Sequence, residues 1–179
     1  LLTHVKQMPD AIREIAEEHR RARREIPEIA DRDIKIALDE WNYWYGPHEF
    51  GLLGTRYFLR DALGIAAGLN EFSRQSEMYY MANYAQTVNV IGAIKTTPTD
   101  SWLEGTGLVL KVYRKEFGTI PVAVSGAPEP LDVAATLTED GTYLTLSVIN
   151  ATHQEYQLTL DFISENIPTQ GTAFVITGS

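Results

Sequence analysis

The chain contains no cysteine, which excludes disulfide bonds and a thiolate nucleophile. It also lacks an apolar run of about 20 residues, the length that a transmembrane helix needs. Positive charge is scarce, since 15 basic residues stand against 24 acidic ones and the net charge is −9. Such a chain has no summed positive field to attract phosphates, so the sequence argues against nucleic acid or a membrane surface as a partner.

An ordinary globular composition remains once these classes are set aside. Of the 179 residues, 44% are hydrophobic and 22% are charged, which is enough for a sizeable core in one domain or two small ones. The sequence opens at Leu1 without an initiator methionine and runs quickly into a helical pattern. We therefore expect a fragment of a longer polypeptide, and its cellular location stays open.

The first 118 residues alternate between helix and strand patterns. Helices are expected over residues 9–26, 55–69 and 104–117, and short buried strands over residues 34–38 and 78–82. This order is typical of an α/β fold in which helices cover a parallel sheet. Because two strand–helix units cannot close a barrel alone, residues 1–118 are predicted to be the last βα units of a (β/α)₈ TIM barrel.

The pattern changes to all-β near residues 118–121. Apolar residues alternate over 131–137 and 144–148, and Asp140-Gly141 between them is typical of a hairpin turn. Further strands are expected over residues 156–162 and 173–176. Residues 119–179 are therefore predicted to form a C-terminal β-sandwich domain, and since the last strand stops close to Ser179 the sandwich is not expected to be complete.

Two carboxylates, Asp39 and Glu40, follow the first predicted strand at once, with several aromatic residues after them. A carboxylate in this position lies at the mouth of a parallel barrel, where such folds place their active sites. Retaining glycoside cleavage needs two carboxyl groups about 5 Å apart, a nucleophile and an acid/base. Glu40 is a candidate for one of them, and a structural ion pair is the alternative. Neighbouring strand residues point to opposite faces, so Asp39 is interpreted as a supporting residue.

Two segments resemble those of a known enzyme family. Residues 37–45, ALDEWNYWY, closely resemble the nucleophile segment of family 51 glycoside hydrolases, the α-L-arabinofuranosidases. Residues 83–91, NYAQTVNVI, resemble the segment at the end of that family's eighth barrel strand. The resemblance is good over residues 30–125 and looser in the sandwich. It implies a barrel followed by a C-terminal β-sandwich of jelly-roll type, retaining hydrolysis, and no metal or organic cofactor.

The resemblance also implies roles for individual residues. Glu40 matches the catalytic nucleophile, Trp44 an aromatic side chain that walls the sugar subsite, and Gln86 a polar group that contacts bound arabinose. From the residues alone, Gln86 would be interpreted as structural. Further candidates for lining the pocket, with core packing or loop anchoring as an equal alternative, are Asn42, Tyr43, Tyr45 and His48.

The second catalytic carboxylate has no match in the chain. The family's acid/base glutamate lies in an Asn-Glu pair on an earlier barrel strand, whereas Asn70-Glu71 here follows a predicted helix. Glu49, Glu77 and Glu104 also lack the right context. We therefore expect the acid/base and most of the sugar subsite in a missing N-terminal barrel segment, and we expect this fragment alone to be inactive.

The sequence thus predicts a retaining hydrolase that releases terminal α-L-arabinofuranosyl groups from hemicellulose or arabino-oligosaccharides. Its expected partners are an arabinose-containing oligo- or polysaccharide, the missing barrel segment and further copies in a homo-oligomer. One alternative keeps the barrel and changes the sugar, as in a xylosidase or an endo-glucanase. Another is a non-catalytic module in which the sandwich binds carbohydrate or packs against other subunits.

Overall fold

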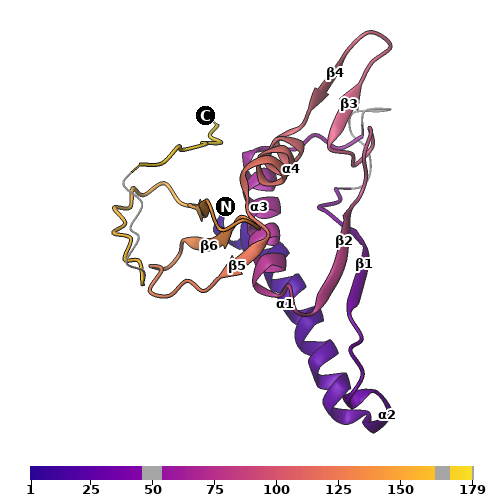
Figure 1. Ribbon diagram of the computed structural model, residues 1–179. Coiled ribbons are helices and arrows are strands. Elements are labelled where there is room, and N and C mark those ends of the chain that lie inside the picture. Colours follow the sequence, from indigo (N-terminus) through magenta and orange to yellow (C-terminus); the bar gives the residue numbers. More distant parts are fainter. Residues whose placement is uncertain (46–53, 164–169, 179) are drawn as a thin grey trace.

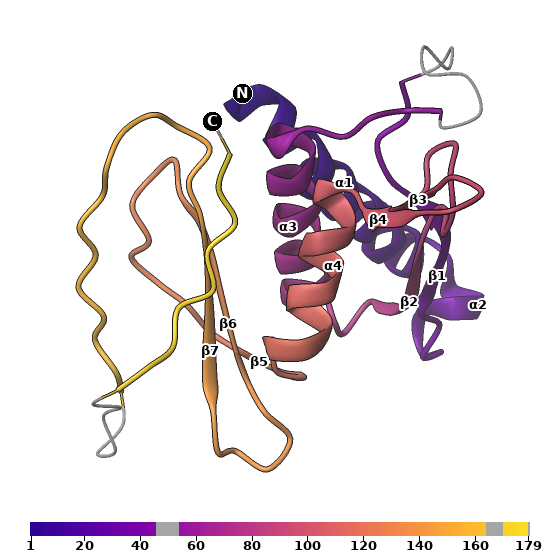
Figure 2. The same cartoon turned by 90° about the horizontal axis from the view of Figure 1, so that it is seen from above.

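The structure is a computed structural model that describes residues 1–45, 54–163 and 170–178. Helices α1, α3 and α4 form a central layer between two sheets, a narrow one on one side and a larger one on the other (Figures 1 and 2). The helices are α1 (Leu2–Glu25), α2 (Pro27–Ala30), α3 (Leu59–Arg74) and α4 (Gly105–Glu116). The strands are β1 (Ile36–Trp41), β2 (Tyr79–Tyr84), β3 (Ile94–Thr96), β4 (Ser101–Leu103), β5 (Ile120–Val122), β6 (Asp132–Leu137) and β7 (Leu144–Ile149).

Helix α1 is longer than the sequence predicts. It begins at Leu2, so Pro9 lies inside it and the prediction of a start at residue 9 was wrong. Val5 and Met8 continue the apolar stripe of Ile12 and Ala16 toward the N-terminus, and all four side chains are buried. Burial of this stripe outweighs the loss of one backbone donor at the proline.

Strands β1 and β2 are parallel neighbours, as the βα alternation predicts. Helix α3 connects them and packs with α1 on one face of the pair. The prediction of a short buried strand over residues 34–38 was wrong in its bounds and its burial, because β1 begins at Ile36, continues through Trp41 and buries one face only. Ile36 and Leu38 pack against the core, whereas Ala37 and Glu40 are exposed.

Aromatic side chains fill the core between this sheet and the helices. The ring of Trp41 meets Phe72 and Tyr84 edge to face, at centroid distances of 5.0 and 5.8 Å. Gly68 on α3 permits this approach, because a Cβ there would lie 2.8 Å from Met8 Cγ and 3.1 Å from the Trp41 ring. The close contact of α1, α3 and β1 therefore depends on a glycine in mid-helix.

Two boundaries in this half differ from the prediction and one agrees. Helix α3 starts at Leu59 rather than residue 55, since Asp61 Oδ2 accepts the backbone N–H of Phe58 at 2.7 Å and caps the helix there. It continues to Arg74, so Asn70 and Glu71 lie inside the helix and not after it. Helix α4 matches its predicted span within one residue at each end.

The β3–β4 hairpin was not predicted. Its strands have three residues each and pair in antiparallel fashion between Ile94 and Leu103. Runs this short carry too little alternation to be recognised in a sequence. The hairpin projects away from the helices at one end of the molecule (Figure 1).

The C-terminal region forms a three-stranded antiparallel sheet in the order β5-β6-β7. The predicted hairpin is confirmed, with Leu137 opposite Leu144 and with Gly141 in the turn at a φ of +68°. The predicted strands over residues 156–162 and 173–176 are wrong for this structure, because those described residues have no strand conformation.

A second sheet, which a sandwich would need, is not formed by the described residues. Alternation of apolar residues favours a strand but does not supply its hydrogen-bonding neighbour. Among the described residues, no strand pairs with residues 156–162, and Leu160, Phe174 and Val175 are all exposed. The two segments therefore carry the pattern of strands without the pairing.

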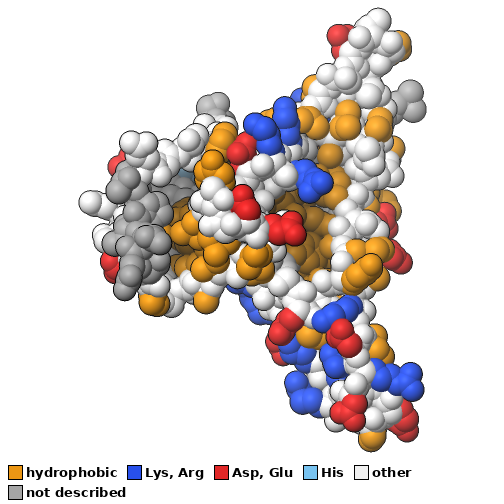
Figure 3. Space-filling model, viewed as in Figure 1, with side chains coloured by type: hydrophobic (Ala, Val, Ile, Leu, Met, Phe, Trp, Pro, Cys, Tyr) orange, Lys and Arg blue, Asp and Glu red, His pale blue; other side chains and the backbone are white. Residues whose placement is uncertain are grey.

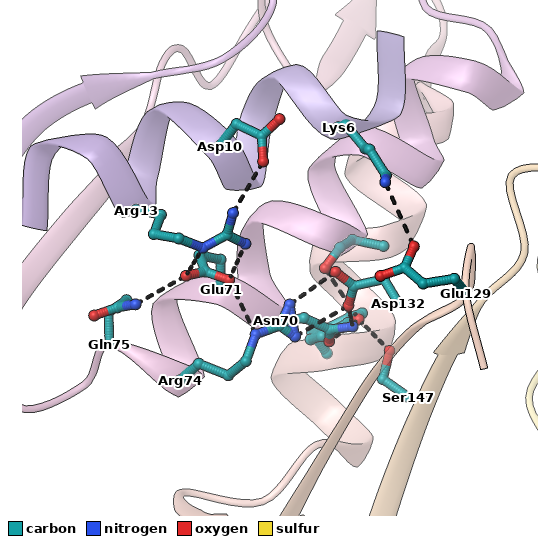
Figure 4. A network of polar contacts seen from close by, with 12 residues as sticks. Lys6, Asp10, Arg13, Asn70, Glu71, Arg74, Gln75, Glu129, Asp132 and Ser147 are labelled. Atoms are coloured by element: carbon teal, nitrogen blue, oxygen red, sulfur yellow. Dashed lines mark hydrogen bonds and ion pairs between the residues drawn. The ribbon is translucent and has the colours of Figure 1, made fainter. Parts of the chain in front are cut away.

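A network of polar contacts joins the helices to this C-terminal sheet (Figure 4). Arg74 Nη2 lies 2.7 Å from Asp132 Oδ2 on β6, and Asn70 Nδ2 donates to Asp132 Oδ1 at 2.7 Å. Glu71, only 1% exposed, accepts from Arg13 and Arg74 at 3.0 Å each. Tyr113 donates to Asn70 Oδ1 at 2.7 Å and lies 2.6 Å from the Ser147 hydroxyl.

Apolar and charged side chains are distributed unevenly over the face shown in Figure 3. In Figure 3 hydrophobic side chains gather around the hollowed centre of the face shown, whereas positive and negative side chains intermingle over the far end of α1 and α2. No helix among the described residues is both long and apolar enough to cross a membrane.

Candidate active site at the ends of the parallel strands

The predicted site residues lie where β1 and β2 end side by side. Trp41 is paired with Tyr84, and the backbone N–H of Ala85 donates to the Trp41 carbonyl at 3.1 Å. Glu40 precedes this pairing on β1, and Gln86 follows it on the chain leaving β2. The parallel arrangement thus brings to one sheet edge two segments that are more than forty residues apart in the sequence.

A β-bulge occurs at the two carboxylates. Between the pairs Leu38–Ala82 and Trp41–Tyr84, β1 has two residues, Asp39 and Glu40, where β2 has one. Leu38 and Trp41 therefore both face the core although they are three residues apart. The rule that neighbouring residues face opposite sides does not hold across such a bulge, and both carboxylates are exposed.

Glu40 and Asp39 are free of structural partners within the described part of the chain, where no hydrogen bond or ion pair engages either carboxylate. An exposed carboxylate at a strand end that serves no ion pair can react with a substrate. The structural alternative for Glu40, an ion pair, has no support among the described residues.

The two other residues that the resemblance identifies are also exposed. Trp44 is 72% exposed and presents its indole to solvent. The amide nitrogen of Gln86 lies 3.5 Å from the carbonyl oxygens of Val88 and Asn89, at the limit of hydrogen bonding. Both side chains are therefore available at the strand ends, and Gln86 has no short bond of its own among the described residues.

Tyr43 and Tyr45 are anchored by a buried polar cluster. The Tyr43 ring stacks on His4 at 4.4 Å, and its hydroxyl donates to the His4 carbonyl at 2.9 Å. Tyr45 donates to Asp61, which is completely buried and lies 2.9 Å from His4 Nε2. Burial raises the pKa of the Tyr45 phenol, and its bond to Asp61 raises it further. These contacts are those of loop anchoring.

Asn42 contacts backbone on three sides. Its Nδ2 lies 2.7 Å from the Ala85 carbonyl, 2.8 Å from the Ile91 carbonyl and 2.7 Å from the Tyr57 hydroxyl. Its Oδ1 accepts the N–H of Tyr43 at 2.7 Å. Asn42 therefore ties β1 to the loop that follows β2.

The remaining predicted candidates fall into two groups. His48 and Glu49 lie outside the described residues. Glu77 pairs with Arg20 on the surface, and Glu104 accepts the Tyr57 N–H at 2.9 Å. With Glu71 in the polar network, each of these three glutamates has a structural partner.

A model of the α-L-arabinofuranosidase C-terminal domain matches residues 39–178. The chain is 35% identical over 165 residues to a probable α-L-arabinofuranosidase C of Aspergillus flavus, with 80% of this chain and 32% of that protein covered. It is 34% identical over 167 residues to α-L-arabinofuranosidase C of Emericella nidulans, again covering 80% and 32%. The chain belongs to the α-L-arabinofuranosidase family.

Solved structures agree with this family 51 assignment. The Thermotoga petrophila family 51 α-L-arabinofuranosidase superposes with a TM-score of 0.70 at 26% identity, over 83% of this chain and 35% of that one. The Thermotoga maritima enzyme in its arabinose complex gives a TM-score of 0.67 at 25% identity, over 80% and 35%. The chain thus spans about a third of the length of the relatives and structures it matches.

Sequence reasoning missed several residues that shape this arabinofuranosidase segment. Asp61, His4 and Tyr57 act through partners that are far away in the sequence. Lys95 is completely buried, donates to the Val90 carbonyl at 2.9 Å and lies 5.7 Å from the centre of the Tyr57 ring. Burial lowers the pKa of this lysine. No sequence pattern identified these residues, since the predicted helix start at residue 55 placed Asp61 beyond the first turn, where a capping residue is expected.

No metal site is evident among residues 1–45, 54–163 and 170–178, which hold no group of three or more His, Asp or Glu side chains that could bind an ion. The arrangement instead offers an exposed carboxylate, an exposed indole and an exposed amide at adjoining strand ends. These are groups that can attack, stack on and hydrogen bond to a sugar.

Proposed function

We propose that this chain is the C-terminal part of a retaining α-L-arabinofuranosidase in which Glu40 is the nucleophile. One observation carries the proposal: Glu40 lies exposed in the bulge that ends β1, without a structural partner among the described residues, in a chain that belongs to this family. In this proposal residues 1–118 are the last units of a (β/α)₈ barrel, and residues 119–179 belong to a β-sandwich of jelly-roll type.

The exposed sheet face supports the barrel. Tyr80 and Met81 on β2 are 79% and 39% exposed, although strands of a soluble sheet seldom leave such side chains uncovered. Further strands of the same polypeptide, paired to the edges of β1 and β2 and closed into a barrel, would turn this face into the barrel interior and so cover it.

In the proposed reaction, Glu40 attacks the anomeric carbon of a terminal arabinofuranosyl group. The glycosidic C–O bond breaks as the ester bond to Glu40 forms, and the leaving oxygen takes a proton from the acid/base. That residue then removes a proton from water, which displaces Glu40 and restores the free carboxylate. Trp44 would wall the sugar and Gln86 would hydrogen bond to it.

The acid/base glutamate is proposed to come from a part of the polypeptide outside this chain. Glu71, Glu77 and Glu104 are each occupied by a structural partner, which supports this origin. Arabinose-containing glycans are the proposed substrates, in keeping with the arabinose complex of the Thermotoga maritima relative. The named relatives are all arabinofuranosidases, so a xylosidase, an endo-glucanase or a non-catalytic module has no comparable support.

The test compares Glu40→Gln with Asp39→Asn in the complete polypeptide, using an aryl α-L-arabinofuranoside. Both variants remove one exposed carboxylate from the same bulge, so they are matched in charge and position. Glu40→Gln should lower kcat on the order of 10³-fold or more, since the covalent route is lost. Asp39→Asn should keep most of the activity, and equal losses in the two variants would refute Glu40 as the nucleophile.

A further inference from the structure

We propose that Asn42 is a positioning residue that fixes the Gln86 loop, residues 85–91, against the strand carrying Glu40. The inference rests on the proposed function and deepens it, because it assigns to Asn42 the alignment of two groups that act on the same sugar. It replaces the expectation that Asn42 lines the pocket.

The hydrogen-bonding capacity of Asn42 is used up by the protein. The side-chain amide has two N–H donors, and three acceptors surround it: the Ala85 carbonyl, the Ile91 carbonyl and the Tyr57 hydroxyl. The three distances are 2.7, 2.8 and 2.7 Å. Its oxygen already accepts the N–H of Tyr43. No N–H of Asn42 is therefore left to recognise a ligand.

The two carbonyl groups lie at the two ends of the Gln86 loop. Ala85 comes directly before Gln86, and Ile91 comes five residues after it. Asn42 itself stands two residues after Glu40 on the chain leaving β1. One short side chain thus connects both ends of the loop to the segment that holds the proposed nucleophile.

Gln86 has little else to hold its own side chain. Its amide nitrogen has two contacts of 3.5 Å within its own loop. The backbone of the loop must therefore set the position of the amide relative to Glu40. The backbone carbonyl of Gln86 accepts the N–H of Ala93 at 3.1 Å, which links the loop to the β3–β4 hairpin but not to β1.

Tyr57 completes the connection from the other side. Its hydroxyl lies 2.7 Å from the Tyr43 carbonyl and 3.1 Å from the Ile91 carbonyl, so it also joins the exit of β1 to the loop. Lys95 and the N–H of Thr55 both donate to the Val90 carbonyl, at 2.9 and 2.8 Å. These bonds hold the loop at its far end. Ala85, the residue before Gln86, is tied to the end of β1 by its own N–H, which donates to the Trp41 carbonyl at 3.1 Å, and by the side chain of Asn42. Of these residues, only Asn42 connects both ends of the loop to this segment through its side chain.

The experiment is a double-mutant cycle on kcat/KM in the complete polypeptide, with an aryl α-L-arabinofuranoside as substrate. The variants are Asn42→Asp, Gln86→Ala and the two combined. Asn42→Asp keeps the shape of the side chain but turns an oxygen toward two carbonyl groups, so it should push the loop away. We expect a loss of about 10- to 100-fold, the size that a displacement of about 1 Å produces.

The expected result is strong coupling between the two sites. If Asn42 acts through Gln86, the kcat/KM of the combined variant should be within about 3-fold of that of Gln86→Ala alone. Once the Gln86 side chain is gone, displacing its loop costs little more. A purely structural role would instead give losses that multiply. The matched control is Asn150→Asp, the same change in a partly buried turn after β7 that contacts neither strand end, and it should leave kcat/KM unaltered.

Losses that multiply, or an Asn42→Asp variant with unaltered kcat/KM, would overturn the inference and leave the proposed function intact. Wild-type protein that does not turn over the arabinofuranoside, or Gln86→Ala without effect, would overturn the proposed sugar site and the inference with it. Thermal unfolding identifies variants that do not fold. If Asn42→Asp does not fold, Asn42→Ala, which introduces no charge, takes its place in the double-mutant cycle. The combined variant is again compared with Gln86→Ala alone.

Discussion

The two sheets of this molecule are attached to the same helices by different chemistry. The β1–β2 sheet packs on α1 and α3 through aromatic rings, with Trp41 between Phe72 and Tyr84. The β5–β7 sheet is linked to α3 through Arg74 and Asp132, and its Ile149 belongs to the buried hydrophobic cluster. The first interface depends on shape, and the second depends on charge as well.

This difference predicts different sensitivities. An apolar core loses stability through cavities, whatever the pH. Arg74, which binds Asp132 of the second sheet, also binds the buried carboxylate of Glu71. Such a network loses stability when its buried carboxylate is removed or neutralised, because the arginines then lose their compensating charge. Single substitutions can therefore test whether the two sheets depend on different interactions.

The largest effect should follow from Trp41→Ala. The Trp41 ring is buried and packs closely against Gly68. Removing the ring leaves a cavity, and the glycine has no side chain to fill it. We expect the free energy of unfolding to fall by about 3–5 kcal/mol, measured by urea titration. Trp44→Ala, three residues away and 72% exposed, is the control and should stay within about 0.5 kcal/mol. Equal losses would contradict the assignment of the core.

A smaller effect is expected from Glu71→Gln, which leaves the guanidinium groups of Arg13 and Arg74 without their shared carboxylate. Arg13 is partly exposed, so water compensates part of the loss, and the expected cost at neutral pH is about 1–3 kcal/mol. Glu77→Gln on the surface is the control and should cost less than about 1 kcal/mol. Urea titration of both variants measures the difference, and equal costs would argue against a special role of Glu71.

Acid should remove the same contribution in the wild type. Burial alone would raise the pKa of Glu71, but hydrogen bonds from Gln75, Arg13 and Arg74 outweigh it and hold the pKa below its usual 4.5. The folded state then binds fewer protons than the unfolded state, so the stabilisation is complete above pH 4.5 and is lost as the pH falls through the lowered pKa. The difference in free energy of unfolding between wild type and Glu71→Gln should therefore become smaller below pH 4.5. A difference that grows there would refute the lowered pKa of Glu71.

Patterns in the sequence were sufficient where one element decides its own conformation. Helix α4 and the turn at Gly141 are of this kind, and the parallel pair β1–β2 followed from the order of strands and helices. Local order was insufficient for residues 156–162, because a strand also needs a neighbour. The three-residue strands β3 and β4 were too short for any periodicity to appear.

Some features of the candidate site could likewise be predicted from the sequence, and others could not. The motif around Glu40 identified its segment, and the parallel pairing could be derived from the βα order. The bulge that exposes both Asp39 and Glu40 could not, because it depends on the register with β2. The contacts of Asn42 could not be derived either, since its partners lie fifteen to forty-nine residues further along the chain.

The role of Glu40 is tested most directly by trapping the nucleophile. The complete polypeptide is incubated with an arabinofuranose-configured epoxide, which a catalytic carboxylate opens to form an ester, and the modified peptide is then mapped by mass spectrometry. If Glu40 is the nucleophile, one adduct forms on Glu40 and is absent in Glu40→Gln. An adduct on Asp39, or an active polypeptide that carries no adduct on Glu40, would contradict it.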